Sequence, residues 1–316
     1  MDKNEILNKI FEKIEASDSI VVFGHMKPDG DCVGSVMGCK KELQYLFPNK
    51  KIYAVGTHPS YLPQYIEPSD DVDDETIKRS LALMVDLSDI DRVEDQRIKD
   101  AKDIVCFDHH VSNGDREFLV YRDELAPSAT AILTECFLNT YGKLSKEAAD
   151  YFYLGLITDS GRFQYDSSTK TFEIAGKLIQ CGADYKRLYH ELYKQTSRDL
   201  KVRSYVYDNY VFDGLVCYIV IKKEDYHSRG LEESDVAGKV NLLAQLDDHP
   251  IWVFFLEQED GIIRVEFRSD GTRNVQKAAL AFGGGGHFAA SGTRITDFSK
   301  VKEIVDYLNT LPEEQL

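Results

Sequence analysis

The sequence predicts an α/β protein of two domains: the first is built on a parallel sheet, and the smaller second domain contains a mixed sheet. Three observations support this prediction. The chain has 316 residues, more than a single hydrophobic core usually serves. Between about residues 19 and 180, short apolar runs alternate with helical stretches, a pattern typical of parallel sheets. From residue 211 onward, strand-like segments dominate.

The first domain is expected to cover residues 1–185. A stripe of isoleucines at Ile6, Ile10 and Ile14 predicts an amphipathic helix at its start. Four apolar runs are expected to form strands: Ser19–Gly24, Lys51–Val55, Leu81–Val85 and Ile104–Phe107. Helices are expected over 32–47, 129–141, 146–156 and 169–181.

The second domain is expected to cover residues 211–316, after a polar helical connector over 186–210. Its expected strands are Leu215–Ile221, Ile251–Glu257 and Ile262–Arg268. The last two flank an Asp-Gly turn, which is typical of hairpins. A helix over Lys300–Leu308 closes the chain. The active site is expected in the cleft between the two domains.

The composition indicates a protein without membrane or secretory segments. Hydrophobic residues make up 43% of the chain, and no apolar run approaches the roughly 18 residues that a spanning helix needs. The charged, amphipathic N-terminus differs from a signal peptide. The six cysteines form no CxxC pair and no framework spacing, which favours reduced thiols. The expected location is therefore the cytoplasm.

The net charge of −16 argues against a long nucleic acid as the partner. Proteins that bind long nucleic acids usually neutralise many phosphates with a basic surface. An acidic chain can still bind a small anion if metal ions supply positive charge locally. The charge therefore favours short oligonucleotides or small nucleotide phosphates over polymers.

Four apolar segments each run into acidic or histidine residues. They are VVFGHMKPDGDCVGS, LALMVDLSD, IVCFDHH and YLGLITDSGRF. Ligands of open α/β sheets gather beyond the carboxyl ends of the strands, so these segments are expected to converge. The helix that follows Asp31 begins with small residues, Gly34 and Ser35, so we also expect its N-terminal amides to be accessible to an anion. The candidate residues are His25, Asp29, Asp31, Asp86, Asp108, His109, His110 and Asp159.

This residue set predicts a centre with two divalent metal ions. Carboxylates mixed with imidazoles suit Mn²⁺, with Mg²⁺ or Co²⁺ as alternatives. Two metals bridged by an aspartate would relieve the repulsion among so many acids and would activate a water for attack on phosphorus. Taken singly, each segment also matches a plain turn, a helix cap or surface histidines. Their order, each after an apolar run, favours the metal centre.

The segments GHMKPDGDCVGS, MVDLSD, DHH and ITDSG resemble, in this order, the four signature motifs of the DHH phosphoesterases. The resemblance implies that His25 and Asp29 bind one metal ion. It implies that the second ion is bound by Asp31, His109 and Asp159. The fourth motif departs slightly from the usual pattern, because serine follows the aspartate where threonine is commoner.

The resemblance also implies three catalytic roles. Asp86 would bridge the two metal ions. His110 would contact the scissile phosphate or assist the leaving group. Asp108 would orient the histidines from behind, as a carboxylate next to a metal-bound histidine usually does. Cys32, beside Asp31, is expected to be a small buried residue and not a ligand.

The stretch RVEFRSDGTRNVQKAALAFGGGGHFAASG resembles the C-terminal DHH-associated domain of the nanoRNase and 3′-phosphoadenosine 5′-phosphate phosphatase branch. Alternation places Arg264, Glu266 and Arg268 on one face of a strand. Between 262 and 294, the five basic residues Arg264, Arg268, Arg273, Lys277 and Arg294 outnumber the two acids Glu266 and Asp270. This local excess of positive charge is opposite in sign to the net charge of the whole chain, and it favours phosphate binding.

The glycine run, Gly283–Gly286, is either a flexible turn or a place where the backbone approaches a nucleotide closely. The resemblance favours the second interpretation. Phe288 and Tyr165 are candidates for stacking on a base, with core packing as the alternative. The predicted substrate-binding residues are Arg264, Arg268, Ser269, Gly284, Gly285, Gly286 and His287.

The resulting hypothesis is a hydrolase that releases 5′-mononucleotides from very short oligonucleotides and converts 3′-phosphoadenosine 5′-phosphate to AMP. As alternatives, the protein would be an exopolyphosphatase or pyrophosphatase, or a phosphodiesterase of cyclic or linear dinucleotides. A nucleotide sensor without catalysis is a further alternative, although every ligand type is present. The family resemblance adds the expectation of a homodimer.

Overall fold

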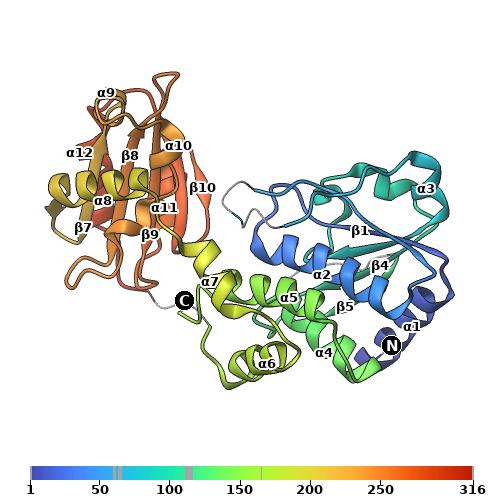
Figure 1. The fold of residues 1–316 in the computed structure, drawn as a ribbon. Helices are drawn as coiled ribbons and strands as arrows, with labels where there is room; N and C mark the ends of the chain where they lie inside the picture. Colours follow the sequence, from blue (N-terminus) through green and yellow to red (C-terminus); the bar gives the residue numbers. More distant parts are fainter. Residues whose placement is uncertain (1, 60–61, 63–65, 111–116, 165, 315–316) are drawn as a thin grey trace. The chain divides into compact units, whose positions relative to one another are not determined.

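The computed structural model describes residues 2–59, 62, 66–110, 117–164 and 166–314. Within it the chain divides into two compact units, Met1–Lys194 and Gln195–Leu316 (Figure 1). Tyr165, one of the two proposed stacking residues, lies outside the described residues.

The N-terminal unit contains a five-stranded, all-parallel sheet in the order β2-β1-β3-β4-β5. Its central strands β1 and β3 are buried along their whole length, as apolar runs in a sheet covered on both faces must be. The predicted parallel sheet is confirmed. Strand β5 was not predicted, because its four residues are only half-buried and form no long apolar run. The strands are β1 Ser19–Phe23, β2 Lys51–Ala54, β3 Leu81–Val85, β4 Asp103–Asp108 and β5 Leu119–Arg122.

Helices cover both faces of this sheet (Figure 1). Ile20 and Val22 of β1 face a cluster formed with helices α1, α2, α4 and α5, whereas Val21 and Phe23 face α3 and the short helix η2. The described helices of the unit are α1 Lys3–Ala16, α2 Gly30–Leu46, α3 Asp74–Arg79, η1 Ile90–Arg92, η2 Gln96–Asp100, α4 Ala129–Tyr141, α5 Lys146–Asp159, α6 Thr169–Gln180 and α7 Tyr185–Tyr193.

Helices α2 and α5 lie side by side at very close range (Figure 1). A Cβ atom placed on Gly34 of α2 would lie 2.6 Å from the carbonyl oxygen of Tyr151 and 2.9 Å from the amide nitrogen of Gly155, both in α5. The two helices therefore need glycine at their contact. This contact positions the site, because α2 carries Asp31 in its first turn and α5 ends at Asp159.

The C-terminal unit contains a six-stranded sheet in the order β10-β11-β9-β8-β7-β6. Only β7 and β8 are parallel among the described pairs, so the predicted mixed sheet is confirmed. The glycine run and the residues after it form β10 and β11, which were not predicted. The strands are β6 Val211–Asp213, β7 Val216–Ile221, β8 Ile251–Glu257, β9 Ile263–Ser269, β10 Gly285–Gly286 and β11 Ala290–Ile295.

Alternate residues of this sheet face two different helical layers. Trp252 and Phe254 of β8 pack with residues of α8 and the short helix η3, whereas Val253 and Phe255 pack with α11 and α12. The period of two along β8 therefore decides which layer each side chain joins. The helices are α8 Ser197–Asn209, α9 Lys223–His227, α10 Glu233–Val236, η3 Val240–Leu243, α11 Val275–Ala281 and α12 Lys300–Asn309.

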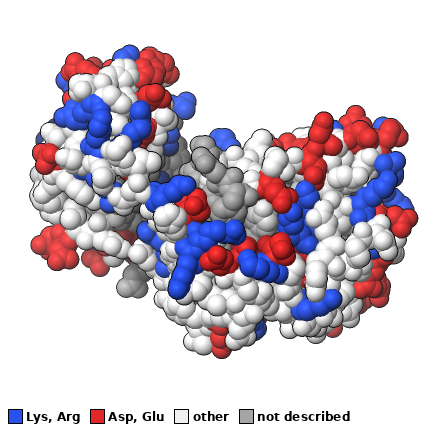
Figure 2. All heavy atoms as spheres, viewed as in Figure 1, with Lys and Arg blue, Asp and Glu red and all other residues white. Residues whose placement is uncertain are grey.

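The surface mixes charges of both signs. Figure 2 shows lysine and arginine side chains lying among aspartates and glutamates, with acidic side chains gathered near α3. No helix of the described part of the chain is long and apolar enough to cross a membrane.

The contact between α2 and α5 predicts that Gly34→Ala destabilises the protein. We expect the free energy of unfolding to fall by about 1–3 kcal/mol, because the methyl group overlaps rigid backbone atoms. Urea unfolding followed by circular dichroism measures the change. The matched control is Gly176→Ala in α6, where nothing lies within 4 Å of the added Cβ. This control should leave stability unchanged or raise it by about 0.5–1 kcal/mol. Equal behaviour of the two variants would contradict the prediction.

Candidate active site

Asp86 is the central residue of the predicted set. Its Oδ2 atom lies 3.4 Å from Nε2 of His25, and its Oδ1 atom lies 3.4 Å from Nε2 of His109. The carboxylate is almost completely buried, and Oδ1 has no hydrogen-bond partner among the described residues. Directly after β3, Asp86 adopts a left-handed backbone with φ of 65°, which is strained for a residue other than glycine. The backbone therefore aims one buried carboxylate between two imidazoles.

Two further carboxylates approach the same imidazole of His109. Its Nε2 atom lies 3.5 Å from Oδ2 of Asp159 and 3.8 Å from Oδ2 of Asp31. The ligand atoms of Asp31, His109 and Asp159 all lie within 4.8 Å of one another, as do those of Asp86, His109 and His110. The structure thus brings together residues from β-strand ends and from two helices. Buried carboxylates that converge on imidazoles, with Oδ1 of Asp86 left without a hydrogen bond among the described residues, fit a divalent metal ion.

Asp31 is held by the N-terminus of helix α4. Its Oδ2 atom accepts a hydrogen bond from the amide of Ala129 at 2.6 Å. Its Oδ1 atom accepts two from Thr130, one from the amide at 3.1 Å and one from the hydroxyl at 2.7 Å. Amides at a helix N-terminus stabilise a negative charge. The sequence analysis did not identify Thr130, although Ser128 signals the start of this helix as its N-cap.

Asp29 caps helix α2. Its Oδ1 atom accepts hydrogen bonds from the amides of Asp31 at 3.1 Å and Cys32 at 3.0 Å. The expectation that these N-terminal amides are accessible to an anion is therefore wrong, because Asp29 already uses them. The same oxygen lies 3.9 Å from Nε2 of His25. Asp29 and Asp159 also line a pocket of about 270 Å³ together with Gly30, Thr158, Leu192 and Tyr193.

The electrostatics of the centre follow from its crowded carboxylates. Burial raises the pKa of Asp31 well above its usual value, and the charges of Asp86 and Asp159 add to this effect. Burial likewise raises the pKa of Asp159 to about 6. Burial alone would lower the pKa of His25, but its contact with Asp86 prevails and raises that pKa to about 11. Burial would also lower the pKa of His109, but the neighbouring carboxylates have the larger effect and raise that pKa to about 10. Imidazolium protons therefore neutralise the carboxylates of the protein itself.

His110 and Asp108 form a pair beside this centre. Asp108 is completely buried, and its Oδ1 atom accepts a hydrogen bond from the amide of His110 and lies 3.0 Å from Nδ1 of the same residue. The imidazole of His110 is half exposed. Nδ1 of His109, in contrast, lies 3.3 Å from the carbonyl oxygen of Ala126. Asp108 therefore orients His110 directly.

Arg122 of β5 stands behind this pair and was missed by the sequence analysis. Its Nε atom lies 3.7 Å from Oδ2 of Asp108, and its Nη2 atom donates to the hydroxyl of Ser88 at 2.6 Å. A buried carboxylate is costly unless positive charge and hydrogen bonds compensate it. Arg122 and Ser88 provide such contacts. No motif marked them, because Arg122 lies in the half-buried strand that was also missed.

The predicted substrate-binding residues lie in the C-terminal unit. Arg264, Arg268 and Ser269 belong to β9, and the hydroxyl of Ser269 donates to the carbonyl of Arg273 at 2.6 Å. The glycine run needs glycine for close packing, since a Cβ on Gly284 would lie 2.1 Å from the carbonyl oxygen of Gly292. Gly285 and Gly286 form β10. His287 is exposed, and its amide donates to the carbonyl of Ala290 at 2.8 Å. Phe288 is half-buried.

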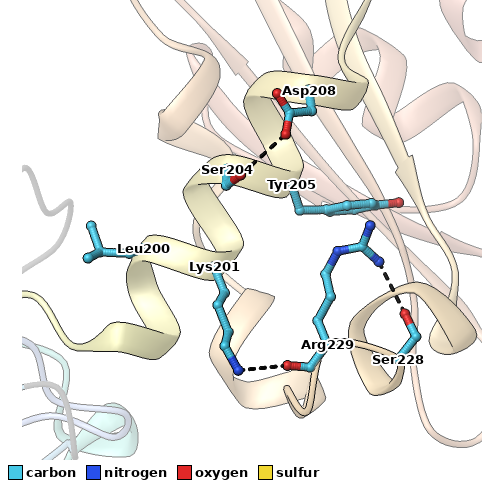
Figure 3. A pocket seen from close by; sticks show the side chains of 7 residues that line it. All are labelled: Leu200, Lys201, Ser204, Tyr205, Asp208, Ser228 and Arg229. Carbon is cyan, nitrogen blue, oxygen red and sulfur yellow. Dashed lines mark hydrogen bonds between the residues drawn. The ribbon is translucent and has the colours of Figure 1, made fainter.

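A separate pocket of about 600 Å³ lies between α8 and the end of α9 (Figure 3). Its side chains are bound to one another. Lys201 donates to the carbonyl of Arg229 at 3.0 Å, and the guanidinium of Arg229 lies 4.2 Å from the ring centre of Tyr205. Ser204 donates to Asp208 at 3.2 Å. The pocket contains none of the predicted site residues, and its contacts stabilise the packing of α9 against α8.

Comparison with known proteins identifies the family of the chain. The model of the DHH family, N-terminal domain, matches residues 19–156, and that of the DHHA1 domain matches 214–314. The bifunctional oligoribonuclease and PAP phosphatase NrnA of Bacillus subtilis is 31% identical over 311 residues, covering 97% of this chain and 98% of that protein. The protein of the same name from Mycoplasma genitalium is 32% identical over 312 residues, covering 96% and 97%.

A solved structure shows the same fold. The crystal structure of an exopolyphosphatase-related protein from Bacteroides fragilis matches with a TM-score of 0.85 at 22% identity, covering 97% of this chain and 96% of that chain. Fold, site and family models together define a phosphoesterase that depends on metal ions. The chain belongs to the DHH family of phosphoesterases and is therefore a hydrolase.

The raised histidine pKa values predict that metal binding releases protons. At pH 8 the rings of His25 and His109 are protonated in the metal-free protein, since their pKa values lie near 11 and 10. Each ring must lose its proton to bind a metal ion. We therefore expect about two protons per protein on titration with Mn²⁺, measured with a pH indicator in weak buffer. Affinity for Mn²⁺ should also rise with pH, because protons compete with the metal.

Two histidine variants test the source of these protons. His25→Ala should release about one proton fewer than the unmodified protein. His58→Ala serves as the control, because His58 contacts Ser69 and none of the carboxylates of the centre. Metal binding without proton release at pH 8 would contradict the raised pKa values of the two imidazoles.

Proposed function

We propose that this protein hydrolyses very short oligonucleotides to 5′-mononucleotides and converts 3′-phosphoadenosine 5′-phosphate to AMP. The observation that carries the proposal is the convergence of Asp31, Asp86 and Asp159 on His109. Full-length relatives named as bifunctional oligoribonuclease and PAP phosphatase support the choice of substrates.

The candidate metal ligands form two groups, and each group would hold one divalent ion. His25, Asp29 and Asp86 lie together, and His109, Asp31 and Asp159 lie together. Asp86 presents one oxygen to each group, which suits a bridging ligand. Oxygen and imidazole ligands favour Mn²⁺, with Mg²⁺ or Co²⁺ as alternatives. When bound, such a pair of ions activates a water for in-line attack on phosphorus.

His110 then acts on the leaving group. In its protonated form it donates the Nε2 proton to the departing ribose oxygen as the phosphorus–oxygen bond breaks. Asp108 accepts a hydrogen bond from the opposite nitrogen, so it fixes the ring and stabilises its positive charge. Arg122 balances the charge of Asp108 when His110 has lost its proton. These roles come from contacts of the chain's own residues.

The C-terminal unit supplies the groups that bind the rest of the substrate. Arg264 and Arg268 present guanidinium groups from the same strand face. Within the turn formed by residues 284–287, Gly285 has no atom within 4 Å of an added Cβ and His287 is exposed, so the backbone here lets a nucleotide approach closely. The remaining surface mixes charges, and the net charge is −16. This combination favours substrates of a few nucleotides.

The proposal predicts that Asp86→Ala abolishes hydrolysis. The unmodified protein with Mn²⁺ should release mononucleotides from a labelled dinucleotide and AMP from 3′-phosphoadenosine 5′-phosphate. Removal of the shared ligand should lower both rates by about a thousandfold or more. Product release is measured by chromatography.

Asp91→Ala is the matched control, since Asp91 follows the same strand but is exposed and pairs with Lys99. Its rates should equal those of the unmodified protein. Hydrolysis of polyphosphate in place of both nucleotides would contradict the proposed substrates. Equal activity of the Asp86→Ala variant would contradict the proposed metal centre.

A further inference from the structure

One face of strands β9 and β11 carries arginines beside very small residues. The strands are antiparallel, with Arg264 opposite Arg294, Glu266 opposite Gly292 and Arg268 opposite Ala290. Opposed residues in such a pair project on the same face, with Cβ atoms about 4.5–5.5 Å apart. Arg264 and Arg294 therefore form a cross-strand pair of like charge.

Among the residues that the structure describes, this pair has one acidic partner. The Nε atom of Arg264 lies 2.8 Å from Oε1 of Glu266, which also accepts a hydrogen bond from the amide of Gly238. Glu266 is buried, at 3% exposure. Arg294 is exposed, and its side chain makes no ion pair or hydrogen bond with any residue that the structure describes. Two guanidinium groups against one carboxylate leave one positive charge.

The contact with Glu266 also sets the direction of the Arg264 side chain. It uses Nε, so the two terminal amino groups of the guanidinium stay available as donors. Like charges directly opposite each other in a sheet are destabilising. An anion bound between Arg264 and Arg294 removes this repulsion and accepts charge-assisted hydrogen bonds from both.

The pair lies far from His287, the last residue of the glycine turn, although Gly284 at its other end lies beside Thr293. The turn adjoins Ala290, through the hydrogen bond from the His287 amide. Arg294 lies four residues further along β11, or roughly 13 Å at the rise of an extended strand. A single nucleotide held at His287 does not span this distance. A chain of three or more nucleotides does.

We propose that Arg264 and Arg294 bind a backbone phosphate of an oligonucleotide, away from the nucleotide held at His287 and Arg268. This inference rests on the proposed function and deepens it. Arg294 is then a residue that determines specificity, because it contacts oligonucleotides but does not contact 3′-phosphoadenosine 5′-phosphate.

Kinetics of Arg294→Ala test the proposal. With an RNA pentanucleotide, KM should rise about tenfold, the loss expected for one charge-assisted hydrogen-bonding group, while kcat stays within twofold. With 3′-phosphoadenosine 5′-phosphate, both constants should stay within twofold. The slope of log kcat/KM against log salt for the pentanucleotide should become shallower by about 0.7, the value for one phosphate contact on a single strand. Arg294→Lys should keep the salt slope.

Lys302→Ala is the matched control. It removes the same charge from α12, which packs on the opposite face of the sheet. Lys302 is 66% exposed and pairs with Asp213 and Asp306. Both substrates should be hydrolysed as by the unmodified protein. An equal rise in KM for the control would overturn the proposal, because only overall charge would then matter.

A binding measurement separates this inference from the proposed function. Fluorescence anisotropy with a fluorescein-labelled RNA pentanucleotide and Mn²⁺ compares Asp86→Ala with the double variant Asp86→Ala, Arg294→Ala. A dissociation constant about tenfold higher for the double variant supports the phosphate contact whether or not the unmodified protein hydrolyses RNA. Equal constants, with both variants folded by circular dichroism, overturn it even if hydrolysis is observed.

Discussion

The approach of three carboxylates to one imidazole is the constraint on which the N-terminal unit depends. Asp31, Asp86 and Asp159 surround His109 within 3.4–3.8 Å. Such a cluster is unfavourable by itself, since burial and like charge both oppose ionisation. Each carboxylate is nevertheless fixed by a different structural element. The fold therefore holds together groups that would separate in an open chain.

The three carboxylates do not sit in equally favourable positions. Asp31 accepts hydrogen bonds from the N-terminus of α4, where the helix dipole favours a negative charge. Asp159 is the last residue of α5, where the dipole opposes it. The glycine contact between α2 and α5 enforces this arrangement, since a Cβ on Gly155 would lie 2.6 Å from Oδ1 of Asp31. The tight packing of α2 against α5 thus holds Asp159 in an electrostatically unfavourable position.

Sequence reasoning predicted those structural features that leave a local pattern in the sequence. Strands β1 and β3 were visible as apolar runs, and the candidate ligands were visible because each follows such a run. Thr130 and Arg122 were missed, since their contacts join residues distant in sequence and leave no periodic signal. Strand β11 was missed because only two of its six residues, Ala290 and Ile295, are apolar. Without β11 its register with β9 was unknown, so Arg294 could not be placed opposite Arg264.

The location of the arginine pair also bears on how such a protein can diversify. Arg264 and Arg294 project from a strand face, while the buried cores of the C-terminal unit are formed by other residues. Replacing Arg294 leaves those cores intact. The carboxylates that surround His109 belong to the other folded unit and are not changed either. Under the proposed role of Arg294, preference for substrate length and the chemistry of cleavage are determined in separate units and can change independently. Substitutions on this strand face can therefore alter substrate preference without altering the residues of the candidate active site.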